Sequence, residues 1–432
     1  MMFSLGLPEP LLKADDVCMI FSCRRISFFV SSALHEGGMI VMLLSFALIF
    51  ILGMLAGQLC AKAKLPPLMG MLITGIAIGP SCLNLLDSSL LNISSELRRI
   101  ALIIILLRAG LNLRLEDLKK VGRSAIMMCF VPACFEILGM LAAAPVLFGL
   151  SVLDSLILGT VIAAVSPAVI VPHMLKIMDE GYGVKQGIPQ MILAGASADD
   201  VFVIVLFTSF TGIAAGGHFE IGSLLRIPVS ILLGIGAGEV LGYAMHQFLS
   251  KIHLSIEKII ILFLSVCFLL VTAEDLINST VGFSGLIAVM AMGMMFAAKA
   301  ETKAADLSKG LSKLWTAAEI ILFVLVGAAV DISYAFQAGL NAVLLIFAVL
   351  VFRMIGVAVC VIGTKLNFRE RLFCMIAYTP KATVQAAIGA IPLSMGLACG
   401  NTVLTVAVIA ILVTAPLGAF LIDLTYRRFL QL

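Results

Sequence analysis

Charged residues are scarce in this chain: they make up 12% of its 432 residues, whereas 62% are hydrophobic and the mean hydropathy is +1.17. That composition excludes an ordinary soluble protein and indicates a polytopic membrane protein. The formal net charge is only +3, and no Lys/Arg-rich run with interleaved aromatic residues is present, so nothing points to a nucleic-acid partner. The ten cysteines include no C-x-x-C pair, which favours packing roles over metal or disulfide roles.

The apolar residues form thirteen segments from Met39 onward, each close to the roughly 20 residues that a spanning helix needs. The segments cover 39–60, 65–81, 97–113, 123–149, 151–175, 187–214, 222–249, 257–273, 281–299, 310–330, 337–363, 369–397 and 401–424. Several exceed the minimum and contain Gly or Pro, so tilted or broken helices are expected. We therefore predict an all-α polytopic membrane protein with 13 transmembrane helices that contacts membrane lipid.

Residues 1–38 are treated as an N-terminal extension outside this pattern. Arg24 and Arg25 interrupt its apolar run and leave only Ile26 to Leu34 unbroken, which is too short to span a bilayer. The extension could be an interfacial helix, a signal-like segment or a non-native stretch upstream of a start at Met39 or Met42.

The distribution of basic residues predicts the orientation in the membrane. After the odd-numbered segments come Lys62, Lys64, Arg114, Lys119, Lys120, Arg123, Lys176, Lys185, Lys251, Lys258, Lys299, Lys303, Lys309, Lys313, Lys365, Arg369, Arg371, Arg427 and Arg428. The opposite side has only Lys13, Arg24, Arg25, Arg98, Arg99 and Arg226. Because cytoplasmic loops are enriched in Lys and Arg, we expect an external N-terminus and a cytoplasmic C-terminus, in the cytoplasmic (inner) membrane of a bacterium.

Two apolar segments are interrupted by proline and polar residues, one around Pro167 and the other around Pro380. In each half of the chain a charged residue precedes the break, with 31 residues from Glu136 to Pro167 and 27 from Arg353 to Pro380. The two sets lie an odd number of helices apart, so they have opposite orientations. Inverted repeats with one interrupted helix in each half mark the midplane site of a transporter. The sequence thus predicts inverted repeats with two crossed broken helices.

Asp199 and Asp200 are adjacent acids in an apolar run that extends from about Ile188 to Ala215. An ionised carboxylate near the centre of a membrane costs at least ~2.5 to 3.5 kcal/mol. On a helix, neighbouring side chains point about 100° apart, so the two carboxylates must have different roles. Carboxylate oxygens bind hard cations and also protons, and a site that holds one or the other is the minimum requirement for exchange.

The other intramembrane charges have predicted supporting roles. Glu136 and Arg353 occupy comparable places in the two halves and have opposite charge, so we expect a buried ion pair between them. Lys381 could neutralise the carbonyl ends of the broken helices or extend to the membrane surface, and with Pro167 and Thr383 it is assigned to support of the breaks. Structural roles are favoured for Glu239, Glu319 and His173, whereas Arg108 could either extend to the membrane surface or have a functional role.

These residues lie in stretches that resemble those of the monovalent cation/proton antiporter superfamily, in its sodium/hydrogen antiporter branch with an adjacent double-Asp motif. The matching stretches are Leu107-Arg108-Ala109-Gly110-Leu111, Ala164-Val165-Ser166-Pro167-Ala168-Val169-Ile170-Val171-Pro172, Ala196-Ser197-Ala198-Asp199-Asp200 and Pro380-Lys381-Ala382-Thr383-Val384-Gln385-Ala386-Ala387-Ile388-Gly389. Their order along the chain makes the resemblance specific, although a double Asp alone is a weak signal.

The resemblance implies a homodimer in which a dimerisation domain flanks a core that contains the broken helices. The dimerisation domain would comprise residues 39–113 and 257–330. The core would comprise residues 123–214, with the broken helix at 151–175, and residues 337–424, with the broken helix at 369–397. A linker helix at 222–249 would join them.

The resemblance also assigns the site. Asp200 would be the principal carboxylate for Na⁺ and H⁺, and Asp199 would assist it or pair with a base. Many relatives have Thr-Asp at the first break where this chain has Val165 and Ser166, so cation coordination would rely on the Ser166 side chain, main-chain carbonyls and water. Arg353 replaces the Lys of electrogenic relatives, which favours one proton per cation.

The resulting prediction is a secondary antiporter that exchanges Na⁺ or Li⁺ for H⁺ by alternating access, with no enzymatic activity and no cofactor. A K⁺/H⁺ antiporter and a sodium-coupled organic-anion symporter of similar fold remain alternatives at this point. An intramembrane aspartyl protease needs two carboxylates facing each other from two helices, whereas Asp199 and Asp200 share one helix. A channel would leave the inverted breaks unexplained.

Overall fold

A computed structural model describes residues 38–63, 65–112, 122–216, 221–252, 254–277 and 283–432, and every regular element among them is a helix. The predicted extension 1–38 therefore lies almost wholly outside the described residues. The helices are α3 (Gly38–Lys62), α4 (Pro67–Ile78), α5 (Ser88–Asn92), α6 (Ser94–Asn112), α8 (Arg123–Met128), α9 (Val131–Phe148), α10 (Val152–Ala163), α11 (Pro167–Asp179), α12 (Ile188–Ala215), α13 (Ile221–Lys251), α14 (Ile256–Ile277), α15 (Gly285–Lys299), α16 (Glu301–Ala328), α17 (Ile332–Cys360), α18 (Phe368–Ala377), α19 (Thr383–Ile388), α20 (Ile391–Ser394) and α21 (Gly400–Phe429).

Within the described residues, seven helices are long and apolar enough to cross a membrane, and four further apolar helices are shorter. The all-helical, polytopic class predicted from composition is therefore confirmed. The shorter helices include α4 and α15, and also the region of α19 and α20, where the chain is interrupted.

The boundaries differ from the hydropathy pattern in two places. The segment expected at 310–330 belongs to a helix that already begins at Glu301, and only Ala300 separates it from α15. Lys303 and Lys309, expected in a loop, lie in this helix, because hydropathy marks the apolar layer and not the polar turns that extend a helix beyond it. The segment 123–149 is also divided, since α8 ends at Met128 and α9 begins at Val131.

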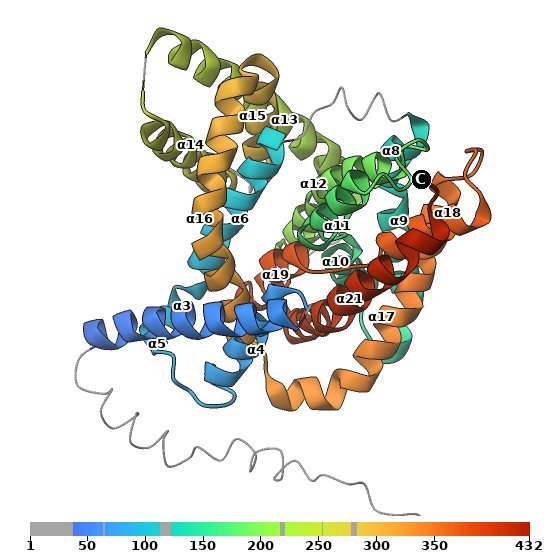
Figure 1. Cartoon of the computed structure of the whole chain (residues 1–432). Coiled ribbons are helices and arrows are strands. Elements are labelled where there is room, and N and C mark those ends of the chain that lie inside the picture. Colours follow the sequence, from blue (N-terminus) through green and yellow to red (C-terminus); the bar gives the residue numbers. More distant parts are fainter. Residues whose placement is uncertain (1–37, 64, 113–121, 217–220, 253, 278–282) are drawn as a thin grey trace, which may run out of the picture.

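The helices form two groups. In the first group, α13 packs along α15, α15 along α6, α6 along α16, and α16 along α4, which also contacts α3. The second group contains α8 to α12 and α17 to α21, with α9 along α17 and α10 between α9 and α12. Figure 1 shows the groups as neighbouring bundles, with α19 between them.

Glycines give the first group its close helix contacts. A Cβ on Gly75 or Gly327 would meet the main-chain oxygen of Val324 or Leu72, and one on Gly110 would meet that of Met290. Such small residues let membrane helices approach at backbone distance. Contacts of this kind hold α4, α6, α15 and α16 together.

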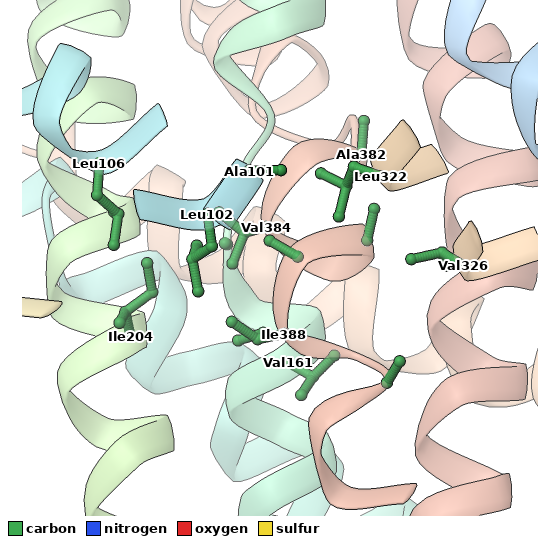
Figure 2. Packing of buried hydrophobic residues seen from close by; sticks show 14 of the residues in the cluster. Ala101, Leu102, Leu106, Val161, Ile204, Leu322, Val326, Ala382, Val384 and Ile388 are labelled. Carbon is green, nitrogen blue, oxygen red and sulfur yellow. The ribbon is translucent and has the colours of Figure 1, made fainter. Parts of the chain in front are cut away.

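The contact between the two groups is lined by aliphatic side chains. Figure 2 shows Leu102 of α6 and Leu322 and Val326 of α16 in one cluster with Val384 and Ile388 of α19, and all five are buried. Aliphatic contacts are non-directional. The α19 region therefore meets the first group through a surface of low chemical specificity.

Candidate functional site

The two predicted breaks meet each other in the second helix group. The helix α10 ends at Ala163, Ala164 and Ser166 have extended backbones, and Pro167 begins α11. The second break lies between α18 and α19, from Tyr378 to Ala382. The main-chain N–H of Ser166 donates a hydrogen bond of 2.9 Å to the carbonyl of Pro380. Both breaks therefore place main-chain groups that lack helical hydrogen bonds at the same buried position. Non-helical backbone is tolerated within a membrane where protein surrounds it in this way.

Arg353, on α17, joins both breaks to two carboxylates. Its Nη1 lies 2.7 Å from Glu136 Oε2 and its Nη2 lies 2.9 Å from Asp199 Oδ2. Its Nε donates to the carbonyl of Tyr378 at 2.6 Å, and Nη1 also donates to the carbonyl of Ala163. A guanidinium is suited to this role because it presents five donors in a fixed planar fork. The contact with Glu136 is the one expected from sequence, whereas sequence leaves open which base pairs with Asp199, and the structure shows that it is Arg353.

Lys381 is fully buried beside the second break. Its ammonium Nζ lies 2.6 Å from Glu136 Oε2, so the alternative in which this lysine extends to the membrane surface is wrong. Its main-chain N–H donates to Thr414 Oγ1 at 2.9 Å. Glu136 thus receives two cationic groups, one from each of α17 and the second break.

The adjacent acids on α12 have different surroundings. Asp199 Oδ2 accepts hydrogen bonds from Arg353 and, at 2.9 Å, from the main-chain N–H of Val165 in the first break. Asp200 is 8% exposed, and its Oδ1 is buried with no hydrogen-bond partner among the described residues. A buried polar atom without a partner is costly and calls for an explanation such as an absent ion, water or proton. The predicted difference in role between the two acids therefore has a structural counterpart.

Further oxygens in the same region are buried and have no partner in the described part of the chain. They are Glu136 Oε1, Asp199 Oδ1, Ser166 Oγ, Thr383 Oγ1 and Gln385 Oε1. Hydroxyl and amide oxygens are ligands that hard cations accept. Together with the carboxylates they form an oxygen-rich environment at the crossing.

The charges of the cluster do not cancel. Three buried carboxylates, those of Glu136, Asp199 and Asp200, face two buried cationic groups, those of Arg353 and Lys381. With all five groups ionised the cluster has a net charge of −1. One additional positive charge, whether a proton or a monovalent cation, neutralises it.

Three residues of the site had no assigned role in the sequence analysis. Tyr378 is fully buried, with its ring 5.1 Å from Arg353 Cζ and its hydroxyl donating to the carbonyl of Met128 at 3.1 Å. Thr414 contacts Lys381, and Gln385 contacts the first break. In the sequence, these residues could be noticed only as polar side chains within apolar segments. The fold is needed to show what they contact.

Four polar residues for which structural roles were favoured or considered take no part in the ion pairs and hydrogen bonds described for this cluster. His173 lies on α11 with its Nε2 3.7 Å from Asp423, and Glu239 is exposed on α13. Arg108 and Glu319 are half-buried on α6 and α16, in the other helix group.

Comparisons of the chain with a family model and with known proteins agree on one family. A sequence model described as "Sodium/hydrogen exchanger, transmembrane" matches residues 26–425. Sodium/hydrogen exchanger 9B2 of Mus musculus is 33% identical over 382 residues, which cover 85% of this chain and 69% of the mouse protein. The Homo sapiens protein of the same name is 33% identical over 442 residues, which cover 99% of this chain and 81% of the human one.

A solved structure supports the fold. The sodium proton antiporter MjNhaP1 from Methanocaldococcus jannaschii superimposes with a TM-score of 0.80 over 91% of this chain and 99% of its own, at 21% sequence identity. At that identity the likeness concerns the fold alone. The family match begins at residue 26, inside the segment that was set apart as an extension.

Proposed function

Because the chain belongs to the sodium/hydrogen exchanger family, we propose that Asp200 and Asp199 form the site at which it exchanges Na⁺ for H⁺. The exchange itself, in a multi-pass membrane transporter that is not an enzyme, follows from the family. The assignment of the site rests on one observation: both acids have a buried, unpartnered Oδ1, but Asp199 Oδ2 is held by Arg353 and Val165, whereas no hydrogen bond or ion pair within the described residues holds the Asp200 carboxylate.

The proposed chemistry is competition at Asp200. A desolvated carboxylate favours any partner that reduces its charge, so it binds either a proton or a dehydrated cation. Asp199 would stay beside it as a fixed carboxylate, held by the guanidinium of Arg353 and the N–H of Val165. Ser166 Oγ and the carbonyl of Val165 would complete the cation's coordination together with Asp199 and water.

The charge of the cluster favours exchange of one proton for one cation. Arg353 remains protonated at any working pH, and Lys381 is paired with Glu136. The remaining charge of −1 is then neutralised by a single H⁺ or a single Na⁺, so the loaded cluster has the same charge in both cases. Li⁺ has the same single positive charge and is expected to be exchanged as well. Whether the site excludes K⁺ must be measured.

Alternating access would move one helix group against the other. We assign residues 39–113 and 257–330 to a dimerisation domain, residues 222–249 to a linker helix, and residues 123–214 and 337–424 to a moving core. The backbone-close glycine contacts within the first group and the aliphatic surface between the groups support this division. Together they would give a rigid frame and a surface along which the core can shift.

The finer topology remains part of the proposal. Thirteen membrane crossings arranged as inverted repeats, an external N-terminus, a cytoplasmic C-terminus and a homodimer are consistent with the helices and with the distribution of basic residues. The relatives named above come from mammals and an archaeon. A bacterial inner membrane is thus a prediction from sequence that these relatives do not support.

The decisive experiment is Asp200→Asn in purified protein reconstituted in liposomes. Na⁺-dependent proton flux should be lost, because an amide cannot release a proton or provide an anionic ligand, while the melting temperature should not fall. Retention of wild-type flux would overturn the assignment. Flux in wild-type liposomes with and without an imposed potential tests the stoichiometry, since exchange of one charge for one is independent of voltage.

A further inference from the structure

Gln385 connects the second broken helix to the first. It is fully buried on α19, and its Nε2 donates hydrogen bonds to the carbonyls of Ala164, at 2.8 Å, and Ile162, at 3.3 Å. Both partners are acceptors, so the side-chain atom that faces them must be the NH₂ group. Gln385 therefore caps free carbonyls at the C-terminal end of α10, which the helix cannot satisfy itself.

The carbonyl held by Gln385 belongs to a peptide unit that also serves the ion site. The C=O of Ala164 and the N–H of Val165 form one planar peptide group, and this N–H donates to Asp199 Oδ2 at 2.9 Å. Gln385 and Asp199 thus hold opposite ends of the same rigid group, although they lie on different helices, α19 and α12. Rotation of that group would break both contacts at once.

The two hydrogen bonds also reinforce each other. A donor on the carbonyl polarises the peptide and strengthens donation from its N–H, since chains of hydrogen bonds are cooperative in a medium of low dielectric constant. Removing the amide of Gln385 leaves the Ala164 carbonyl without this donor and weakens the support of the Asp199 carboxylate. The effect reaches Asp199 without any direct contact between the two side chains.

We propose that Gln385 is a positioning residue for ion binding, which fixes the Ala164–Val165 peptide and through it the orientation of Asp199. This proposal rests on the proposed site at Asp199 and Asp200. The affinity for Na⁺ of a site in the first half of the chain then depends on a neutral side chain from the second half. The main-chain contact between Ser166 and Pro380 links the same two breaks, but side-chain substitution cannot remove it.

The test uses two variants of Gln385 in the full chain reconstituted in liposomes. Gln385→Met keeps the approximate length and volume but has no hydrogen-bonding group, and Gln385→Glu replaces the donor with acceptors that face two carbonyls. The control is Ser394→Ala, which removes an exposed hydroxyl that donates to the carbonyl of Ile391 on α20. Rates are measured over a series of Na⁺ concentrations.

Gln385→Met should raise the apparent KM for Na⁺ by about 10- to 100-fold, the usual effect of losing a residue that orients a metal ligand. Gln385→Glu should change KM at least as much. Ser394→Ala should match the wild type in KM.

Two results would overturn the proposal. One is a folded Gln385→Met protein with wild-type KM, and the other is a fall in maximal rate alone, which would indicate a packing role. Asp200→Asn, measured in parallel, distinguishes failure of this proposal from failure of the proposed ion site at Asp199 and Asp200. If Asp200→Asn abolishes exchange while Gln385→Met leaves KM unchanged, only the role of Gln385 fails; if Asp200→Asn exchanges normally, the site itself fails.

Discussion

Arg353 holds Asp199 by an ion pair of 2.9 Å between Nη2 and Oδ2, and both side chains are fully buried. The same guanidinium contacts Glu136, so one residue of α17 supports acids from both α9 and α12. Asp200, next in sequence to Asp199, has no such partner for its Oδ1 in the described structure. The proposed division between a fixed and an exchangeable carboxylate therefore depends on the position of Arg353.

Asp199→Asn should reduce exchange without abolishing it and should also destabilise the fold. The amide cannot neutralise Arg353, which is left with one carboxylate in place of two. We expect a higher KM for Na⁺ together with a lower melting temperature, whereas Asp200→Asn should lose exchange at an undiminished melting temperature. Equal effects of the two substitutions on both measurements would contradict their separate roles.

Removing Glu136 alone should be worse than removing it together with Lys381. In the wild type the ammonium of Lys381 lies 2.6 Å from the Glu136 carboxylate. Glu136→Gln removes that anion and leaves the ammonium buried without it. Breaking a buried pair in this way costs about 3–5 kcal/mol, whereas removing both charges is far less costly. Melting temperatures of Glu136→Gln, Lys381→Met and the double variant test this, and additive losses would refute the coupling.

Ser166→Ala should weaken cation binding while leaving the fold intact. Its hydroxyl oxygen is buried and has no partner in the described residues, so its loss breaks no protein hydrogen bond. We expect a rise in KM for Na⁺ of about tenfold, equivalent to ~1.4 kcal/mol. Ser155→Ala is the control, because that hydroxyl is bonded to the carbonyl of Ser151 at 2.7 Å; a matching rise in KM there would exclude a ligand role for Ser166.

The end of α21 should contribute a pH-dependent contact with the end of α11. The Tyr426 hydroxyl donates to Glu180 at 2.9 Å and Arg427 lies 3.0 Å from the same oxygen, and together they lower the pKa of Glu180 from its ordinary value. A lowered pKa stabilises the fold above the ordinary carboxyl range, and this contribution is lost as pH falls through the folded pKa.

Glu180→Gln should therefore melt below the wild type at neutral pH, and the difference should shrink in acid. Melting temperatures measured from pH 7 downward would show the two curves converging. Tyr426→Phe, which removes the first donor, should show part of the same difference. A gap that stays constant with pH would mean that Glu180 acts through packing alone.

Hydropathy alone located the helices but misjudged their ends. The polar first turns of α16 have no apolar signal, and Pro132 near the start of α9 gave no indication strong enough to predict the gap between α8 and α9. Pairing of charges was harder to predict. Sequence placed Arg353 opposite Glu136 by position in the two halves, but gave no means of detecting its second contact, with Asp199, 154 residues away.

The sequence by itself determined the class of protein and singled out most residues of the candidate site. A lipid environment requires long apolar helices, so few arrangements are compatible with this composition, and any charge or proline within them stands out. Only the tertiary structure decided which of these residues contact each other. It shows that Arg353 pairs with two acids, that Lys381 is buried against Glu136, and that Gln385 holds the peptide that supports Asp199. These contacts form where the two breaks cross, and the crossing is set by the packing of helices remote in sequence, which no local pattern encodes.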